Sequence, residues 1–328
     1  MRAWILLVAL LGLVLVVARG VSALGAGPPI GPEARRASVG EGRFTIGGAP
    51  VVVYALPTGL VGVRGRHHHA AVSDDTPFPL RMLSILADRT LAAPMPILTY
   101  LVLHPEGAFA IDAGATPGLL DPSRWGHDPV GLRINRAILR LDVRPEETLP
   151  ARLKALGVPA ASLRGIVLTH LHLDHVGAVP ELPGVPVITT RAELTEGARF
   201  GAVSGLGVSA ANLRILEDEL VARPSEGPFG PGLALTEDGA LTVFKTPGHT
   251  PGSTMARLTV DQGVIWFVGD VTFTEDGLGA EALSGMHADL GAARALQGAL
   301  LVERRRGPTL VLPAHDDDAP TRLARFGR

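Results

Sequence analysis

The segment 165–175 reads GIVLTHLHLDH, an apolar run that ends in three histidines and an aspartate. Its apolar half predicts a buried strand, because short runs of this kind are typical of sheet interiors. Alternate side chains share a side in an extended chain, so we expect His170, His172 and Asp174 to converge while the leucines face the core. If a helix begins near Asp174, His175 points to a second place, and the motif can supply ligands for two metal ions. The alternative is a chance cluster of polar residues on a solvated turn.

The composition indicates a large folded domain without thiol chemistry. The chain has 328 residues, of which 46% are hydrophobic and 19% charged, enough to bury one large core or two small ones. Its 40 glycines and 27 prolines alternate with apolar runs and indicate tight turns rather than disorder. A formal net charge of -2 gives no electrostatic reason to bind nucleic acid. Because there is no cysteine, a metal must be held by imidazole and carboxylate, a set that suits zinc and also iron or manganese.

The N-terminus reads as a targeting segment followed by a linker. Residues Trp4–Ala18 form an uninterrupted run of apolar residues and glycine, typical of the core of a signal peptide. Arg19 lies between this core and the small residues of a candidate cleavage site, so an uncleaved membrane anchor is the alternative. We predict that residues 1–24 export the protein to the cell envelope, as a periplasmic or membrane-anchored protein. The glycine- and proline-rich residues 25–42 predict a linker, which leaves 43–328 as the main folded domain.

Alternating strand, loop and helix signals predict an α/β layered fold. The expected strands are 51–56 with a hairpin partner at 60–63, an antiparallel pair at 97–103 and 107–111, and 185–189, 240–245, 264–268 and 309–312. The expected helices are 149–156, 191–197 and 288–304. Residues 121–145 are expected to run over the surface, and 200–232 to form a loop insertion around a helical core at 210–220.

Three more candidate ligands follow farther along the chain. His249 lies in a turn between two prolines, and Asp270 and His315 each follow a predicted strand. One aspartate at a strand end is more often a turn former than a ligand, but a series of strand ends that carry histidine or aspartate indicates a common site. Asp112 also follows a predicted strand, and it either orients a ligand histidine or caps a turn.

This set of residues resembles the ligand set of the metallo-β-lactamase superfamily. The resemblance covers roughly Val51 to the C-terminus and implies an α/β fold, the αββα sandwich of two mixed sheets flanked by helices, with a dinuclear metal site at the sheet edge. Segments 56–59, 104–107, 111–114 and 312–316 are most similar to the N-acyl homoserine lactonase group. The resemblance implies that one metal is held by His170, His172 and His249, the other by Asp174, His175 and His315, and that Asp270 bridges both.

The resemblance further implies a zinc-dependent hydrolase with two Zn²⁺ ions per chain, which opens a lactone or carboxylic ester. Two divalent ions lower the pKa of a shared water to near neutrality and polarise the carbonyl, so no serine or cysteine nucleophile is needed. We expect Asp174 to shuttle a proton to the leaving alkoxide and Asp270 to hold the metals together. The alternatives are a glyoxalase II-like thioesterase, a β-lactamase-like hydrolase, an iron-dependent redox enzyme of the same fold, and a non-catalytic envelope protein.

The expected partner is a small ester or lactone, with N-acyl homoserine lactones as one candidate, and membrane attachment through the N-terminal segment as a second kind of contact. No oligomeric state is predicted. An acyl tail needs an apolar groove. Its candidate walls, which could equally be plain packing, are Phe78, Leu80, Met82, Ile85 and the loop 200–208.

One residue departs from the lactonase pattern. The lactonases carry a tyrosine three residues after the bridging aspartate, where it contacts the substrate carbonyl, and Phe273 stands at that place here. Tyr54 and Tyr100 lie in predicted strands and are expected in the core. Of the remaining histidines, we expect His67–His69 to form a solvated loop, with the rim of a cleft as the alternative. We expect His287 to lie on the surface, with a position that reaches the cleft as the alternative.

Overall fold

A computed structural model describes residues 30–121, 123, 129–199, 212–220, 227–280 and 282–327. The predicted export segment and the loop 200–208 lie outside these residues. Among the helices of the described part, none is long and apolar enough to cross a membrane.

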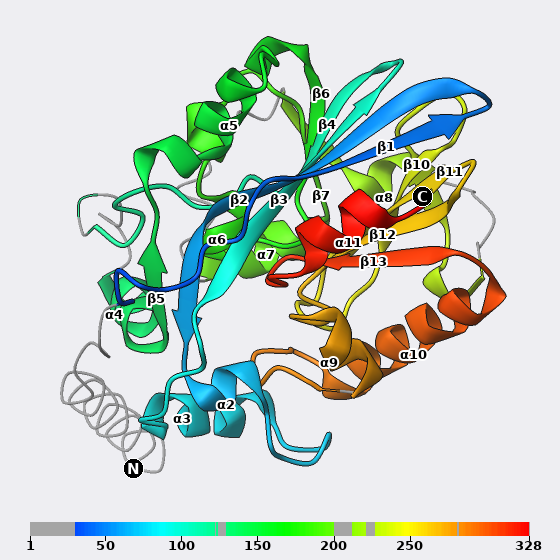
Figure 1. The fold of residues 1–328 in the computed structure, drawn as a ribbon. Coiled ribbons are helices and arrows are strands. Elements are labelled where there is room, and N and C mark those ends of the chain that lie inside the picture. Colours follow the sequence, from blue (N-terminus) through cyan, green and yellow to red (C-terminus); the bar gives the residue numbers. More distant parts are fainter. Residues whose placement is uncertain are drawn as a thin grey trace, which may run out of the picture.

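Two mixed β-sheets form the centre of the molecule (Figure 1). The first has the order β1-β2-β3-β4-β6-β7-β8, with β5 paired to β2, and the second has the order β13-β12-β11-β10-β9. The pairs β4/β6, β6/β7, β7/β8 and β12/β13 are parallel and the others antiparallel. Both sheets are therefore mixed, as the resemblance implied. The first sheet contains β1 (Gly40–Ile46), β2 (Ala49–Val63), β3 (Met95–His104), β4 (Gly107–Ile111), β5 (Leu139–Asp142), β6 (Leu163–Val167), β7 (Val187–Thr189) and β8 (Leu213–Ile215). The second contains β9 (Gly232–Ala234), β10 (Leu241–Lys245), β11 (Thr254–Val260), β12 (Gly263–Gly269) and β13 (Thr309–Pro313).

The main core lies between the two sheets, and period-two alternation produces it. Val243 on β10 and Ile265 and Phe267 on β12 face the first sheet in one buried cluster. Their neighbours Phe244 and Trp266 point to the opposite face and pack in a different cluster. The two faces of the second sheet are therefore both apolar, which requires a helical layer on its outer side.

Helices supply the outer layers on both sides (Figure 1). Leu300 of α10 packs on the outer face of the second sheet, and Leu149 and Leu153 of α5 pack on the outer face of the first. This arrangement confirms the predicted αββα sandwich. The described helices are α2 (Gly65–His68), α3 (Phe78–Ala87), α4 (Pro129–Ile138), α5 (Leu149–Ala155), α6 (Leu173–Val176), α7 (Arg191–Arg199), α8 (Leu216–Glu219), α9 (Glu275–Gly279), α10 (Leu290–Arg306) and α11 (Ala319–Arg325).

The predicted hairpin at 51–63 is wrong, because β2 is one continuous strand. Its register against β3 shifts between Pro57 and Leu60, so the segment that reads as a turn is a bulge. The first half of β2 pairs with β1 and the last four residues pair with β5. Two different partners along one edge therefore keep the strand extended through the bulge. Strand β1 begins at Gly40, inside the segment that the sequence assigned to a linker.

Two other segments also differ from expectation. Residues 121–145 do not simply run over the surface, since they contain α4 and β5, and Leu132 and Ile138 of α4 are buried. Within the helical core expected at 210–220, the described residues 212–220 contain strand β8 and the short α8, because residues 213–215 pair in parallel with β7. The predicted β3/β4 pair, α5, β6, β7, α7, β10, β12, α10 and β13 are confirmed within a few residues.

Candidate metal centre

The candidate ligands meet at one edge of the two sheets. His170 follows β6, Asp270 follows β12 and His315 follows β13, each within three residues of the carboxyl end of the strand. Strands β12 and β13 are parallel, so Asp270 and His315 emerge at the same edge. His249 lies in the turn that joins β10 to β11. Segments far apart in the sequence thus supply one site.

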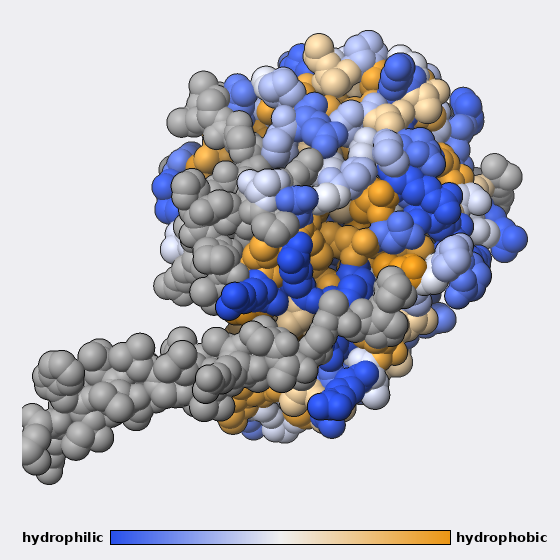
Figure 2. Space-filling model, turned by 90° about the vertical axis from the view of Figure 1, so that its left-hand side faces the viewer, coloured by the Kyte–Doolittle hydropathy of each residue, from blue (hydrophilic) through white to orange (hydrophobic). Residues whose placement is uncertain are grey.

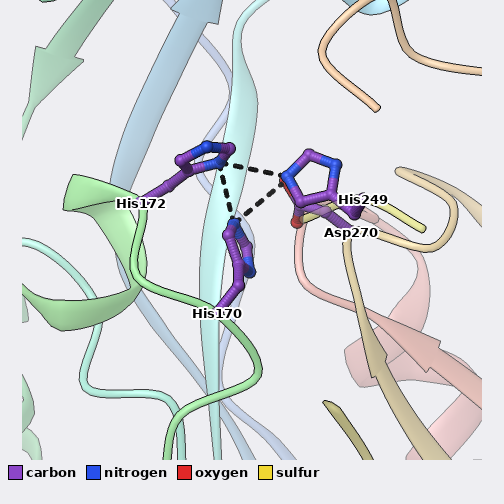
Figure 3. Close-up of side chains that lie close together, drawn as sticks. All are labelled: His170, His172, His249 and Asp270. Atoms are coloured by element: carbon purple, nitrogen blue, oxygen red, sulfur yellow. Dashed lines mark hydrogen bonds and ion pairs between the residues drawn. The ribbon is translucent and has the colours of Figure 1, made fainter. Parts of the chain in front are cut away.

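Three imidazoles point toward one another in the first group of side chains (Figure 3). His172 Nδ1 lies 2.9 Å from His170 Nε2 and 3.0 Å from His249 Nε2. Asp270 Oδ2 is 3.4 Å from His249 Nε2. These are donor atoms that face a common point, as ligands of one metal ion do.

The second group contains Asp174, His175 and His315. His315 Nε2 lies 3.5 Å from Asp174 Oδ2. Asp270 turns its other oxygen to this group, with Oδ1 3.2 Å from His315 Nε2 and 3.3 Å from His175 Nε2. One carboxylate therefore lies between two sets of donors, in the division that the superfamily resemblance implied.

The motif departs from simple alternation after His172. His172 is the N-cap of α6, and Asp174 and His175 both lie within that short helix. Asp174 therefore joins His175 in the second group instead of converging with His170. Because a helix begins within the motif, six consecutive residues can supply side chains to both groups of candidate ligands.

Neighbouring groups orient two of the imidazoles. Asp112 Oδ2 accepts a hydrogen bond from His175 Nδ1 at 2.8 Å, and Pro96 O accepts one from His315 Nδ1 at 2.8 Å. Asp112 also accepts from Thr169 N at 2.7 Å, directly before the motif. Because Nδ1 donates in both rings, Nε2 is the nitrogen that faces the site and is available to a metal ion. Of the two roles considered for Asp112, the structure favours orientation of a histidine.

The expectation that His287 lies on the surface is wrong. Its side chain has no exposed area, and its Nδ1 lies 3.0 Å from Nδ1 of His249. Burial lowers the pKa of His287 to about 4, so the ring is neutral. His249 must keep Nε2 free to act as a ligand, so its Nδ1 donates and His287 accepts. In the sequence, the one feature that pointed to this position was that His287 lies just before the predicted helix, which is α10.

Sequence reasoning also missed Glu193 on α7, which is 1% exposed. Its Oε2 accepts from Leu171 N at 3.0 Å, and its Oε1 accepts from Gly252 N at 3.0 Å and from the Thr250 hydroxyl. One buried carboxylate thus ties the loop that carries His170 and His172 to the turn that carries His249. A glutamate in a short amphipathic helix carries no local mark of this role.

The electrostatics of the site favour cation binding. Burial, with help from neighbouring imidazoles, lowers the pKa of His170 well below its usual range. Burial opposes ionisation of Asp270, but His315 and His175 outweigh it and hold the pKa of Asp270 well below normal. His175 Nε2 and Asp270 Oδ1 are both buried without a hydrogen-bond partner among the described residues. Buried nitrogen and oxygen atoms without partners cost free energy. Divalent cations would coordinate these atoms, so the residues fit a two-metal centre.

Two adjoining cavities open on this centre. A small inner one of about 40 Å³ is lined by Asp174, Asp270 and His315, together with His67 and Phe273. An outer one of about 250 Å³ is mainly apolar. Both cavities share a set of lining residues, namely Asn135, Ile138, His172 and Met286. Figure 2 shows the side of the molecule on which α4 lies in Figure 1, where hydrophobic surface is exposed between hydrophilic residues.

The predicted groove walls are partly confirmed. Phe78 and Met82 line the outer cavity, whereas Leu80 is 57% exposed and Ile85 is packed in the core, so neither does. Tyr100 is buried, as expected. Tyr54 is only half-buried, although it packs against a core cluster.

The prediction of a solvated loop at His67–His69 is wrong for its first residue. His67 is 7% exposed and lies in the wall of the inner cavity, His68 is half-buried, and His69 is exposed. The reason is that α2 turns the backbone inward at this point, which a run of identical residues does not reveal.

Known proteins resemble this chain in both sequence and fold. The family model described as the metallo-beta-lactamase superfamily matches residues 92–315. A protein named N-acyl homoserine lactonase AttM from Azorhizobium caulinodans is 29% identical over 237 residues, which cover 69% of this chain and 83% of that protein. The protein of the same name from Agrobacterium fabrum is 29% identical over 231 residues, with the same two shares covered.

Solved structures show the same fold at low identity. An N-acyl homoserine lactone hydrolase with N-hexanoyl-L-homoserine at its catalytic metal centre has a TM-score of 0.60 and 18% identity, covering 80% of this chain and 92% of that one. A structure described as the dizinc quorum-quenching lactonase AidC has a TM-score of 0.54 and 15% identity, covering 85% and 91%. These likenesses confirm the predicted architecture.

Proposed function

Because this chain belongs to the metallo-beta-lactamase superfamily, we propose that it is a dinuclear zinc hydrolase that opens lactones bearing an apolar acyl chain. The observation that carries the proposal is the position of Asp270, which faces two groups of donor atoms and lines the inner cavity that adjoins an apolar one. The sequence relatives named as lactonases support the choice of substrate.

In this proposal the metal ligands are the residues of the two groups. Zinc bound there supplies a water of near-neutral pKa and a positive charge beside the substrate carbonyl. The first zinc would be held by His170, His172 and His249, the second by Asp174, His175 and His315, and Asp270 would contact both.

The protein's own residues then orient the reactants and move the proton. Asp174 lines the inner cavity and is 6% exposed, so its carboxylate can accept the proton of the attacking water. The same carboxylate can return that proton to the alkoxide oxygen that leaves the ring. Asp112 holds the ring of His175 in place beside it.

The shape of the two cavities suits an amphiphilic substrate. The inner cavity is small and bounded by charged groups, which fits the reacting ester or lactone head. The outer cavity is larger and includes Phe78, Met82 and Ile134 in its wall, which fits an aliphatic tail. A substrate that joins such a head to such a tail would occupy both.

The test is turnover by metal-loaded protein whose metal content is measured on the same sample. We expect two zinc ions per chain and opening of N-acyl homoserine lactones, with both lost in Asp270→Asn. Glyoxalase II-like or β-lactamase-like activity predicts turnover of S-lactoylglutathione or nitrocefin instead, and a redox enzyme predicts iron with oxygen consumption. Any of these without lactone opening would contradict the proposal.

We also propose export to the cell envelope, which rests on the apolar run Trp4–Ala18. Fractionation of cells that express the full chain tests it. Recovery with the cytoplasmic fraction alone would contradict it.

A further inference from the structure

We propose that His67 contacts the substrate and donates a hydrogen bond to the carbonyl oxygen of the lactone ring. This role rests on the proposed function. It gives the inner cavity a hydrogen-bond donor that is not one of the candidate metal ligands. His67 lines that cavity together with Asp270 and His315, although it lies on α2, far from both in the sequence.

The ring of His67 has hydrogen-bonding capacity that the protein leaves unused. The side chain is 7% exposed, and its Nδ1 is buried without a partner among the described residues. A buried polar atom of this kind costs free energy unless it is satisfied, which points to a ligand. Asn135 is the other polar side chain in the wall apart from the candidate ligands, and it already donates to Gly131 O at 2.9 Å.

The backbone holds His67 in place, so the ring needs no hydrogen bond of its own for that purpose. His67 O accepts from Ser284 Oγ at 2.7 Å and from Gly285 N at 3.0 Å, and His67 N donates to Arg64 O at 3.0 Å. A Cβ atom on Gly285 would lie 2.2 Å from Arg66 O, so only glycine permits this close approach. The loop before α10 is thereby joined to α2.

An aromatic side chain lies beside the ring of His67. The His67 and Phe273 rings lie with centroids 6.2 Å apart and tilted by 49°. Phe273 in turn meets the His315 ring edge-on at 5.3 Å. Phe273 forms an apolar wall between a candidate ligand and His67 and can donate no hydrogen bond itself.

The protonation state of His67 matches the role. Burial, followed by the effect of His172, lowers the pKa of His67 to about 3, so the ring is neutral at working pH. A neutral imidazole always has one N–H to donate. It can therefore stabilise negative charge that develops on the carbonyl oxygen without repelling nearby cations, and its proton stays on the ring throughout.

The test compares three variants of the zinc-loaded full chain with N-hexanoyl homoserine lactone as substrate. His67→Phe keeps ring packing against Phe273 and removes the donor, whereas His67→Gln keeps a donor on a more flexible arm. We expect kcat/KM to fall on the order of 100-fold in His67→Phe and to recover in part in His67→Gln. The exposed neighbour variant His69→Gln should match the wild type.

Two measurements separate contact with the substrate from a structural role. Calorimetry with the corresponding non-hydrolysable lactam should show weaker binding to His67→Phe, while its zinc content and melting temperature remain those of the wild type. If the wild type opens the lactone and His67→Phe has the same kcat/KM and lactam affinity, the role of His67 is overturned and the proposed function stands. Loss of zinc from His67→Phe would also overturn it, because the ring would then support the metal site. A zinc-loaded wild type that opens no lactone would overturn the proposed function, and this role with it.

Discussion

The carboxylate of Asp112 lies 2.8 Å from Nδ1 of His175, and Asp112 reaches it with a backbone φ of 62°. That left-handed conformation is uncommon outside glycine and shows that the chain bends sharply to bring the carboxylate to the ring. Burial lowers the pKa of an imidazole, but Asp270 and Asp112 outweigh it and raise the pKa of His175 well above normal. The pair is thus an electrostatic unit in which Asp112 makes His175 a more basic donor.

Replacement of Asp112 by asparagine should weaken one of the two metal sites. The amide cannot supply the negative charge, so we expect about 10- to 100-fold lower affinity for one zinc equivalent and little change for the other. Competition with a chromophoric chelator measures both affinities. The matched control is Asp238→Asn, because Asp238 pairs with His104 Nε2 at 2.9 Å outside the centre. Equal affinities in Asp112→Asn and the control would contradict this role.

Glu193→Gln should destabilise the loops that carry the first group of ligands. The buried carboxylate accepts hydrogen bonds on both oxygens, and an amide nitrogen cannot accept from Leu171 or Gly252. We expect a loss of about 1–3 kcal/mol in the free energy of unfolding of the metal-free protein in urea. Glu217→Gln is the control, since Glu217 pairs with Lys245 near the surface and should cost about 0–1 kcal/mol. Similar losses in the two variants would argue against this role of Glu193.

Acid should destabilise the metal-free protein through His287. Its pKa is about 4 in the folded state, against an ordinary value of 6.5, so between these values only the unfolded chain takes up the proton. The contribution of this group is fully present above about pH 6.5 and falls by up to about 1.4 kcal/mol per pH unit as the pH drops toward 4. His287→Asn should therefore lose less stability than the wild type between about pH 7 and pH 5 in urea unfolding. Parallel curves for the two proteins would show that His287 does not titrate in this way.

Filling the outer cavity should change preference for acyl chain length. Met82 lines this cavity from α3, whereas Leu83 beside it is 49% exposed. We expect Met82→Trp to lower kcat/KM about tenfold for a long-chain acyl lactone and to leave an unsubstituted lactone nearly unaffected. Leu83→Trp should change neither substrate. No loss for either substrate in Met82→Trp would mean that the tail binds elsewhere, and a uniform loss for both would mean that the variant disturbs the whole site.

The metal centre was the part most accessible from the sequence. Histidine and aspartate side chains that follow apolar runs are local features, and a compact motif such as 170–175 is typical of a metal site. The structure brings all the candidate ligands together in the expected two groups. The layer architecture followed from the resemblance that this pattern carries, rather than from the strands themselves.

Segments whose structure depends on distant partners were predicted less well. The bulge at Pro57 has the residues of a turn, and only pairing with β1, β3 and β5 keeps β2 extended through it. Strand β8 exists because β7 offers it a parallel partner. Strand pairing overrides the local preference of these residues for a turn or a helix. The hydrogen bonds and burial gained in the sheet outweigh that preference, which is only a few tenths of a kcal/mol per residue.

By itself the sequence determined which side chains can bind a metal and that they follow strands, since both are properties of short segments. Only the tertiary structure decided what happens to the residues that carry no motif. His67, His287 and Glu193 look like surface residues along the chain, yet each is buried beside the centre. Burial and the loss of water partners arise when separate layers pack together, so the charge state and role of these three side chains belong to the assembled fold.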